Sequence, residues 1–264
     1  MKKLTFEPEA YLEQYNLGGL ENLTHLIMSQ SLFEYEDSDL LKSLSNLEFL
    51  RMQYTYYIPK NFFKYSSKLK TLDIDGYLSY VKKEDFDGLR NLTDLKLKLT
   101  SDRLGPISFE GGFTFDRLMS LKSLTISHDT LNILPADSLS NLKNLKKIIV
   151  FCDDYKSNFT KSFNLPKKLF ASLISMKELS LEFFGSKELT EDIFADNFGM
   201  LEKLSISGYK ESTLPENIFK NIPNITELRI VHNNLKSLPC YIFKNLKKLK
   251  ILDLSYNKLT ELPV

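Results

Sequence analysis

The side chains that could carry out chemistry are few and far apart in this sequence. The three histidines, His25, His128 and His232, are separated by long stretches, and no serine or cysteine nucleophile has a base placed to activate it. The segment "DIDG" at residues 73–76 resembles part of a calcium loop, but its glycine follows the second aspartate directly and the closing glutamate is absent. The sequence therefore predicts no enzyme, no metal site and no cofactor.

The charge balance and the apolar content further limit the classes of partner to expect. Lysine plus arginine number 35 and aspartate plus glutamate 34, so no net field would recruit nucleic acid or an anionic membrane. No apolar run reaches the length that spans a bilayer, and the opening "MKKLTFEPEAYLEQY" lacks the apolar stretch of a signal peptide. We therefore expect no nucleic acid partner and no membrane insertion by this segment.

The elements that must position any site come from a repeat. Leucine-type residues at relative positions one, four and six recur ten times, and their first members are separated by 24, 22, 23, 29, 24, 31, 25, 24 and 24 residues. A further frame, Met1/Leu4/Phe6, opens the chain. This is the period of leucine-rich repeats. The ten frames are Leu23/Leu26/Met28, Leu47/Leu50/Met52, Leu69/Leu72/Ile74, Leu92/Leu95/Leu97, Leu121/Leu124/Ile126, Leu145/Ile148/Val150, Met176/Leu179/Leu181, Leu201/Leu204/Ile206, Ile225/Leu228/Ile230 and Leu249/Leu252/Leu254.

A second apolar register precedes the frames by six residues, often as phenylalanine, and by three residues. We interpret it as core packing and not as a ligand stripe, because the interior of a repeat must be filled. The expected fold is an α/β solenoid of ten to eleven repeats, a curved horseshoe with a parallel β-sheet on its concave face and loops, short helices or 3-10 turns on its convex face. The second register comprises Leu17, Leu41, Phe63, Phe86, Phe115, Leu139, Phe170, Phe219 and Phe243, with Phe194 one place out, and Leu89, Leu142, Phe198 and Leu246, with Ser66 as the exception.

The last coils carry a family resemblance. The segment "LPENIFKNIPNITELRIVHNNLKSLPCYIFKNLKKLKILDLSYNKLTELP" resembles the repeats of animal extracellular receptors, and its coil "LPxxIFxNLxxLxxLxLxxNxL" is similar to those of Toll receptors. Slit-like proteins, matrix proteoglycans and lamprey antigen receptors share this coil. The asparagine at its ninth position occurs only at Asn233 and Asn257, so the earlier coils look more like Toll and should be less regular.

This resemblance implies a non-enzymatic recognition module of an innate immune or developmental receptor. Its implied partners are a protein cytokine or a microbial component and a second receptor chain, and its implied location is extracellular or at the cell surface. The sequence holds no cysteine-rich cap and no signalling domain, so we expect residues 1–264 to form one domain truncated at both ends. A cytoplasmic scaffold or adaptor, or another secreted repeat protein, remains the alternative.

The concave face is the expected binding surface, because outward side chains of the strands stay exposed there. Aromatic residues mixed with charge are typical of protein-binding patches, whereas scattered aromatics and solvating lysines are the alternative reading. The long insertions "SDRLGPISFEGG" and "DDYKSNFTKSFN" are second-choice contact sites, with loop drift as the alternative. The candidate ligand-binding residues are Phe49, Tyr54, Lys96, Lys98, Lys122, Lys147, Phe151 and Phe183.

The glycosylation sequons and the two cysteines are weaker indicators of where the protein functions. Four asparagines, Asn22, Asn91, Asn158 and Asn224, lie in glycosylation sequons, about as many as chance would give. Cys152 and Cys240 belong to coils three strands apart, about 14 Å along the stack, and a disulfide needs α-carbons within about 7 Å. We therefore expect no internal disulfide, which favours a reducing compartment unless the thiols are buried or pair elsewhere.

The histidines support one further hypothesis. All three map to side-chain positions that point out of the concave strands. Because histidine titrates near pH 6.5, a pH-sensing ligand surface is one reading of this placement, and ordinary solvated polar positions are the other.

Overall fold

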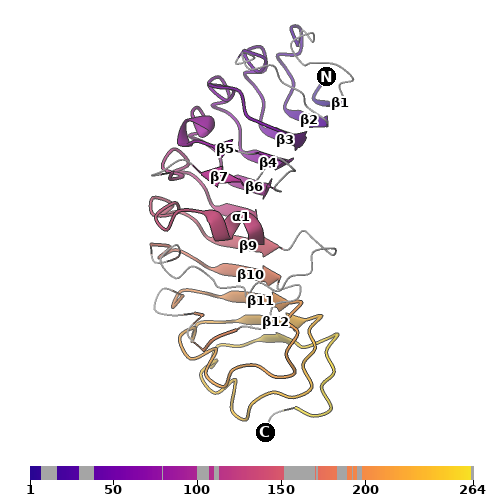
Figure 1. The fold of residues 1–264 in the computed structure, drawn as a ribbon, viewed down its shortest axis with the longest axis vertical. Helices are drawn as coiled ribbons and strands as arrows, with labels where there is room; N and C mark the ends of the chain where they lie inside the picture. Colours follow the sequence, from indigo (N-terminus) through magenta and orange to yellow (C-terminus); the bar gives the residue numbers. More distant parts are fainter. Residues whose placement is uncertain are drawn as a thin grey trace. The chain divides into compact units, whose positions relative to one another are not determined.

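The computed structural model describes residues 1–6, 17–29, 39–78, 80–99, 107–109, 113–151, 170, 172–182, 189–191, 193–194 and 198–262. Contacts divide the chain into two compact units, unit 1 (Met1–Asn144) and unit 2 (Leu145–Val264). Each unit is built around a parallel sheet in which one strand comes from each coil (Figure 1).

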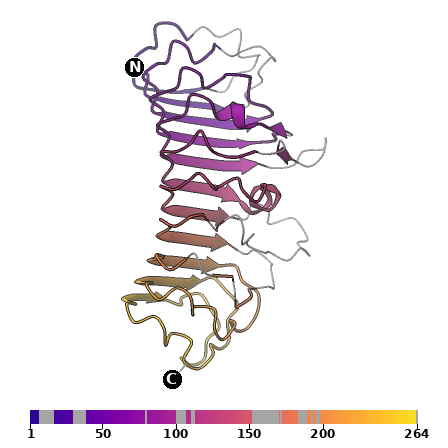
Figure 2. The same ribbon diagram turned by 90° about the vertical axis from the view of Figure 1, so that its left-hand side faces the viewer.

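The sheet of unit 1 has six parallel strands in chain order. Its registers align Leu4, Leu26, Leu50, Leu72, Leu95 and Leu124, which are the middle members of successive frames. The strands lie side by side with their arrows in one direction (Figure 2). They are β1 (Lys3–Phe6), β2 (His25–Ser29), β3 (Phe49–Thr55), β4 (Thr71–Gly76), β6 (Asp94–Leu99) and β8 (Ser123–Ser127).

Unit 2 repeats the arrangement with five parallel strands. Ile148, Leu179, Leu204, Leu228 and Leu252 stand in register, again at the middle of each frame. The strands are β9 (Lys147–Phe151), β10 (Glu178–Glu182), β11 (Lys203–Ser207), β12 (Glu227–Val231) and β13 (Ile251–Asp253). Every predicted frame therefore supplies a strand, and the parallel repeat architecture is confirmed.

The number of full turns is lower than expected. The coils make about eight turns, whereas the frames predicted ten to eleven repeats. A frame marks only the strand of a coil, so the number of frames is not itself a count of full turns.

The second apolar register corresponds to a run of tight turns. In most coils, the residue three places before the frame donates its N–H to the carbonyl three residues back, as Leu44 does to Leu41. The first residue of the frame then donates its N–H to the carbonyl of that residue, as Leu47 does to Leu44. Three residues per turn place these side chains on one side, which explains the spacing of three. Helix is scarce among the described residues, with one α-helix, α1 (His128–Ile133), and one 3-10 helix, η2 (Lys83–Phe86).

The phenylalanine column lies in the core, as predicted. Phe63, Phe86, Phe115, Phe194 and Phe219 are buried, and the ring centroids lie 5.5 Å apart for Phe86 and Phe115 and 6.3 Å apart for Phe219 and Phe243. Burial of aromatic rings of this size is a large part of what holds one coil to the next.

The two ninth-position asparagines tie coils together. Asn233 is buried; its Oδ1 accepts from the N–H of Tyr209, and its Nδ2 donates to the carbonyls of Ile206 and Val231. Asn257 makes the equivalent bonds, with its Oδ1 accepting from Leu235 and its Nδ2 donating to Ile230. In an earlier coil, Thr55 takes the place of asparagine, and its buried hydroxyl has no hydrogen-bond partner among the described residues.

Two local features of unit 1 shape its edge. The pairing of β3 with β4 shifts register between Gln53 and Thr55, and Tyr54 adopts a positive φ of 56° in this bulge. A second, two-stranded parallel sheet joins β5 (Tyr80–Val81) to β7 (Ser108–Phe109) beside the main sheet (Figure 1). β7 belongs to the first predicted insertion, whereas the second insertion lies outside the described residues.

Candidate functional site

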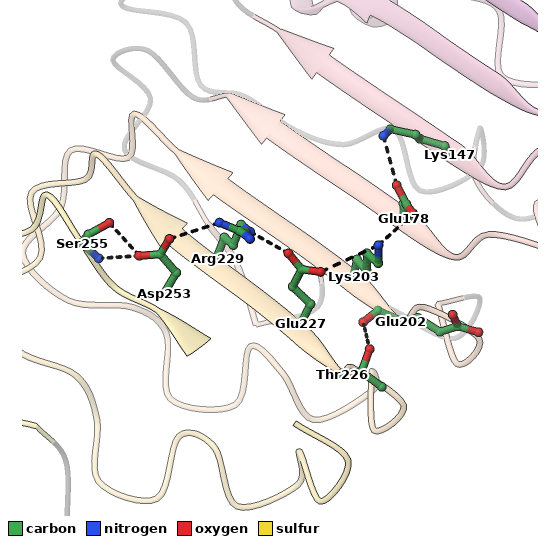
Figure 3. Close-up of polar contacts among 9 residues, drawn as sticks. All are labelled: Lys147, Glu178, Glu202, Lys203, Thr226, Glu227, Arg229, Asp253 and Ser255. Carbon is green, nitrogen blue, oxygen red and sulfur yellow. Dashed lines mark hydrogen bonds and ion pairs between the residues drawn. The ribbon is translucent and has the colours of Figure 1, made fainter. Parts of the chain in front are cut away.

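Outward-facing side chains of unit 2 form a row of alternating charge across its five strands. Each cation contacts an acid on a neighbouring strand or, for Arg229 and Glu227, on the same strand (Figure 3). The row, here the charge row, consists of Lys147, Glu178, Lys203, Glu227, Arg229 and Asp253, with N···O distances of 3.1, 3.4, 3.8, 2.7 and 3.3 Å between successive members.

The repeat itself explains the row. Lys147, Glu178, Lys203 and Glu227 occupy the same position of successive coils and are register partners on adjacent strands. Parallel strands lie about 4.8 Å apart, so like charges at this position would repel, whereas alternating charges attract. Three cations and three acids leave the charge row with no net charge.

Two acids of the row remain ionised more readily than isolated ones. Burial alone would raise the pKa of Glu178, but the hydrogen bond from Lys147 and the charges of Lys147 and Lys203 outweigh it and lower that pKa. The hydroxyl and backbone N–H of Ser255 bond to Asp253 and lower its pKa, with Arg229 and His232 adding to the effect. Glu178 and Asp253 therefore stay ionised at neutral pH.

The lowered pKa of Glu178 predicts a pH-dependent contribution to stability. A carboxyl whose folded pKa lies below its unfolded value of about 4.3 stabilises the fold above that pH and stops doing so as pH falls through the folded pKa. Because the group is partly exposed to screening solvent, Glu178→Gln should cost only about 0.5 kcal/mol at pH 7. In urea titrations this difference should disappear as pH falls below the unfolded pKa of about 4.3 and through the lowered folded pKa.

The control for this experiment is Glu216→Gln, at an exposed glutamate of the same unit. It should change the free energy of unfolding less than Glu178→Gln at pH 7. A Glu178→Gln cost that stayed constant from neutral to acid pH would show that the loss comes from packing and not from the ion pairs.

A hollow of about 270 Å³ lies on the same face and is lined in part by the charge row. Ser180 and Ser205, which also line it, are register partners on β10 and β11. Larger side chains stand on either side in the same register, Ile149 on β9 and Arg229 on β12. Two small side chains between two large ones leave room for a protruding group of a ligand. We call this feature the serine hollow.

The outward face of unit 1 carries looser ion pairs. Asp73 lies between Arg51 at 3.3 Å and Lys96 at 3.9 Å, and Asp75 pairs with Lys98 at 3.7 Å. Burial raises the pKa of Asp73 despite the opposing charges of Lys96 and Arg51. Its Oδ1 and the Nε of Arg51 are buried without a hydrogen-bond partner in the described structure. This cluster is thus less well satisfied than the charge row.

The structure distributes the predicted ligand-binding residues over both units. In unit 1, Phe49 is half-buried against the ring of His25 at 5.5 Å, Tyr54 is 49% exposed, and Lys122 is exposed just before β8. Lys96 and Lys98 belong to the ion pairs of that unit.

In unit 2, Lys147 opens the charge row and Phe151 is half-buried at the end of β9, while Phe183 lies outside the described residues. The residues predicted from the sequence did not include the acids that pair with the lysines of the charge row. These acids could have been predicted, because the same coil position reads Lys, Glu, Lys, Glu along the chain.

Two of the sequon asparagines have a structural role. Nδ2 of Asn91 donates to the carbonyl of Ser67 at 2.8 Å, and Nδ2 of Asn224 donates to Gly199 at 2.6 Å. Asn46 and Asn144, which lie outside sequons, make the same bond to the preceding coil. The coil thus selects asparagine at this position regardless of glycosylation.

The threonine of these sequons is structural too. Thr24, Thr93 and Thr226 each donate a hydroxyl to a carbonyl of the preceding coil at 3.1 Å. Asn22 is exposed, and Asn158 lies outside the described residues. Glycosylation of any of the four stays a prediction.

Of the remaining reactive groups, Cys240 is an exposed free thiol, and Cys152 lies outside the described residues. The ring of His232 stacks on Tyr256 with 4.1 Å between centroids. Within the described ranges, no three His, Cys, Asp or Glu side chains gather closely enough to hold a metal ion. Nor does any described helix have the length and apolarity needed to cross a bilayer.

Family comparisons cover most of the sequence. The family described as "BspA type Leucine rich repeat region (6 copies)" matches residues 2–112 and 56–197, and the family described as "Leucine rich repeat" matches residues 223–264. Among curated proteins, none matches the sequence at a significant level.

Solved structures of receptor repeats share the fold. The Drosophila Toll–Spatzle complex matches 97% of this chain with 19% identity and a TM-score of 0.68, and its glycosylated form matches 99% with 24% identity and a TM-score of 0.71. The TLR13–ssRNA13 complex matches 98% with 22% identity and a TM-score of 0.57.

The chain spans about a third of the length of each of these solved chains, between 33% and 36%. At such identities the likeness establishes the fold alone. It confirms the resemblance to Toll repeats that the coil pattern predicted.

Proposed function

The chain belongs to the leucine-rich repeat family, and from that premise we propose that it is a non-enzymatic module that recognises a protein ligand. The observation that carries the proposal is the outward face of unit 2, where the serine hollow lies beside the charge row. A concave site flanked by oriented polar groups and apolar side chains has the composition of a protein-binding patch. Repeat proteins bind partners on such faces.

The charge row favours a ligand that is recognised by its shape and its hydrogen bonds. Its charges neutralise one another, so a ligand gains little from net charge alone. Specific contacts come from the side chains that line the hollow, with the Ser180 and Ser205 hydroxyls as adaptable partners and Ile149 as an apolar one.

More specifically, we propose that the module is part of the ectodomain of a Toll-like receptor at the cell surface. The shared fold with Toll supports this, and Toll is solved with Spatzle, so the proposed ligand is a protein. A second receptor chain as a partner follows from the same resemblance.

The earlier expectation that nucleic acid is excluded needs correction. TLR13, which shares the fold, is solved with ssRNA, so this fold does not by itself rule out RNA. A test of the ligand class must therefore include an RNA arm.

A second candidate is an intracellular scaffold built from the same repeats. The exposed free thiol of Cys240 favours it, because unpaired surface cysteines persist better in a reducing compartment. The two candidates share a protein-binding face and differ in compartment.

The test is a pairwise binding screen of the purified chain against purified secreted proteins, with a single-stranded 13-nucleotide RNA as a second probe. The proposal predicts a protein ligand whose affinity changes less than about threefold between 50 and 200 mM salt. RNA binding through several phosphates would instead weaken by orders of magnitude over that range. Salt-sensitive RNA binding without a protein ligand would contradict the proposal.

A further inference from the structure

A second cavity, of about 550 Å³, lies in unit 1 and is not part of the sheet face. It opens between residues 57–61, which follow β3, and residues 80–85, which include β5 and η2. These two segments occupy equivalent places in adjacent coils. The volume falls in the range of sites that hold small ligands, about 300–1,000 Å³.

One side of the cavity is apolar and aromatic. Tyr57, Ile58 and Pro59 come from one coil and Tyr80 from the next. The side chain of Tyr80 is 45% exposed. Close by in sequence, Tyr56 is 47% exposed and stacks on Tyr77 with 5.6 Å between centroids. Flat aromatic surface is thus left open at this edge.

The other side of the cavity carries both signs of charge. Lys60 and Lys82 supply ammonium donors, while Glu84 and Asp85 supply carboxylate acceptors, so the four charges sum to zero. The ammonium of Lys82 lies 5.4 Å from the ring centroid of Tyr80, and the backbone N–H of Lys82 donates to Asp85 at 2.8 Å. Donors and acceptors therefore stand next to the aromatic wall in a fixed arrangement.

This combination defines the chemistry of a matching ligand. It gains nothing from a net charge, because the lining charges sum to zero, and it must both donate and accept hydrogen bonds at short spacing. It must also present a flat C–H surface to the tyrosine ring. Hydroxyl groups donate once and accept twice, so a sugar ring meets all three conditions.

An extended peptide matches the cavity less well. Peptides that add to a sheet draw affinity from a row of backbone hydrogen bonds along an open strand. β5 and β7 have two residues each, which is too short for such a row. We therefore propose that this cavity binds a neutral oligosaccharide, with Tyr80 as the stacking platform and Lys82 and Glu84 as hydrogen-bonding partners. This site is separate from the proposed protein-binding face and does not depend on it.

The test uses three neutral hexasaccharides, maltohexaose, laminarihexaose and N-acetylchitohexaose, in saturation-transfer NMR with affinities from calorimetry. At least one should bind, at an affinity that changes little with added salt. Tyr80→Ala should weaken binding about tenfold or more, because the stacking face is lost. Glu84→Gln, which keeps the shape and removes the charge, should weaken it by a smaller factor.

Tyr241→Ala is the matched control, since Tyr241 is also an exposed tyrosine, at 71%, but lies in unit 2. It should leave sugar binding unchanged, and circular dichroism should show that all three variants fold. The proposal is overturned if no hexasaccharide binds at about 10 mM, where a millimolar site is filled. It is also overturned if Tyr80→Ala and Tyr241→Ala act alike, or if hexaproline binds through Tyr80 and no sugar does.

Discussion

Replacing Gly88 by alanine should destabilise unit 1 by about 3 kcal/mol or more. Gly88 follows η2 with a φ of +96°, a conformation that costs an L-residue about 1–2 kcal/mol. A methyl group there would also lie 2.0 Å from the carbonyl oxygen of Phe63 in the preceding coil. Neither atom is the end of a flexible side chain, so the two coils must move apart. Urea denaturation followed by circular dichroism measures the loss.

Gly199→Ala provides the comparison, because a methyl group at Gly199 meets nothing within 4 Å. This variant should stay within about 0.5 kcal/mol of the parent. Equal stabilities for Gly88→Ala and Gly199→Ala would mean that the coils of Phe63 and Gly88 are not packed as closely as described.

Asn233→Ala should destabilise unit 2 by about 3 kcal/mol. The substitution leaves the N–H of Tyr209 and the carbonyls of Ile206 and Val231 without the side chain that bonds them. Because Asn233 is only 9% exposed, water reaches these groups poorly, and each unsatisfied buried group costs about 1–3 kcal/mol. Chemical denaturation of the single variant gives the magnitude.

The neighbouring Asn234 is the matched control. Its Nδ2 donates one bond, to the carbonyl of Lys210, and the residue is more exposed. Asn234→Ala should cost about 1 kcal/mol. If the two substitutions cost the same, the buried asparagine does not link the coils in the way described.

Much of the fold was predictable from the sequence because each coil must bury the same positions. Leu26, Leu50 and Leu72 stand in register as their spacing required, and the phenylalanine column is buried. The period of the repeat decides which positions of each coil are buried, and this period can be recognised in a single sequence. The number of turns was overestimated, because a leucine frame identifies a strand and does not count full turns.

The sites were less predictable because they depend on which side chains meet. Lys147 was predicted as a ligand-binding residue without its acidic partner, although its place in the charge row depends on the ion pair with Glu178. Its pairing requires the register between β9 and β10, which the frames imply but a search for exposed lysines ignores. The cavity at Tyr80 had no sequence signal, because it arises from the gap between two turns.

Sequons show how a short motif can coincide with a structural position of the repeat. Asn91 fits a modification motif, yet the same asparagine recurs at Asn46 and Asn144 without the motif. The bond to the preceding coil explains all three residues. A short motif inside a repeat is therefore weak support for modification until the role of each position in the coil is known.

The most direct test of the central claim is the affinity of a protein ligand for Ser205→Trp, measured by surface plasmon resonance beside Lys236→Trp. Tryptophan at Ser205 fills the serine hollow, whereas Lys236 is exposed in a return segment away from the strands. We predict a loss of at least about tenfold for Ser205→Trp, about 1.4 kcal/mol, and no change for Lys236→Trp. Full affinity in Ser205→Trp, with the fold intact by circular dichroism, would contradict recognition at this face.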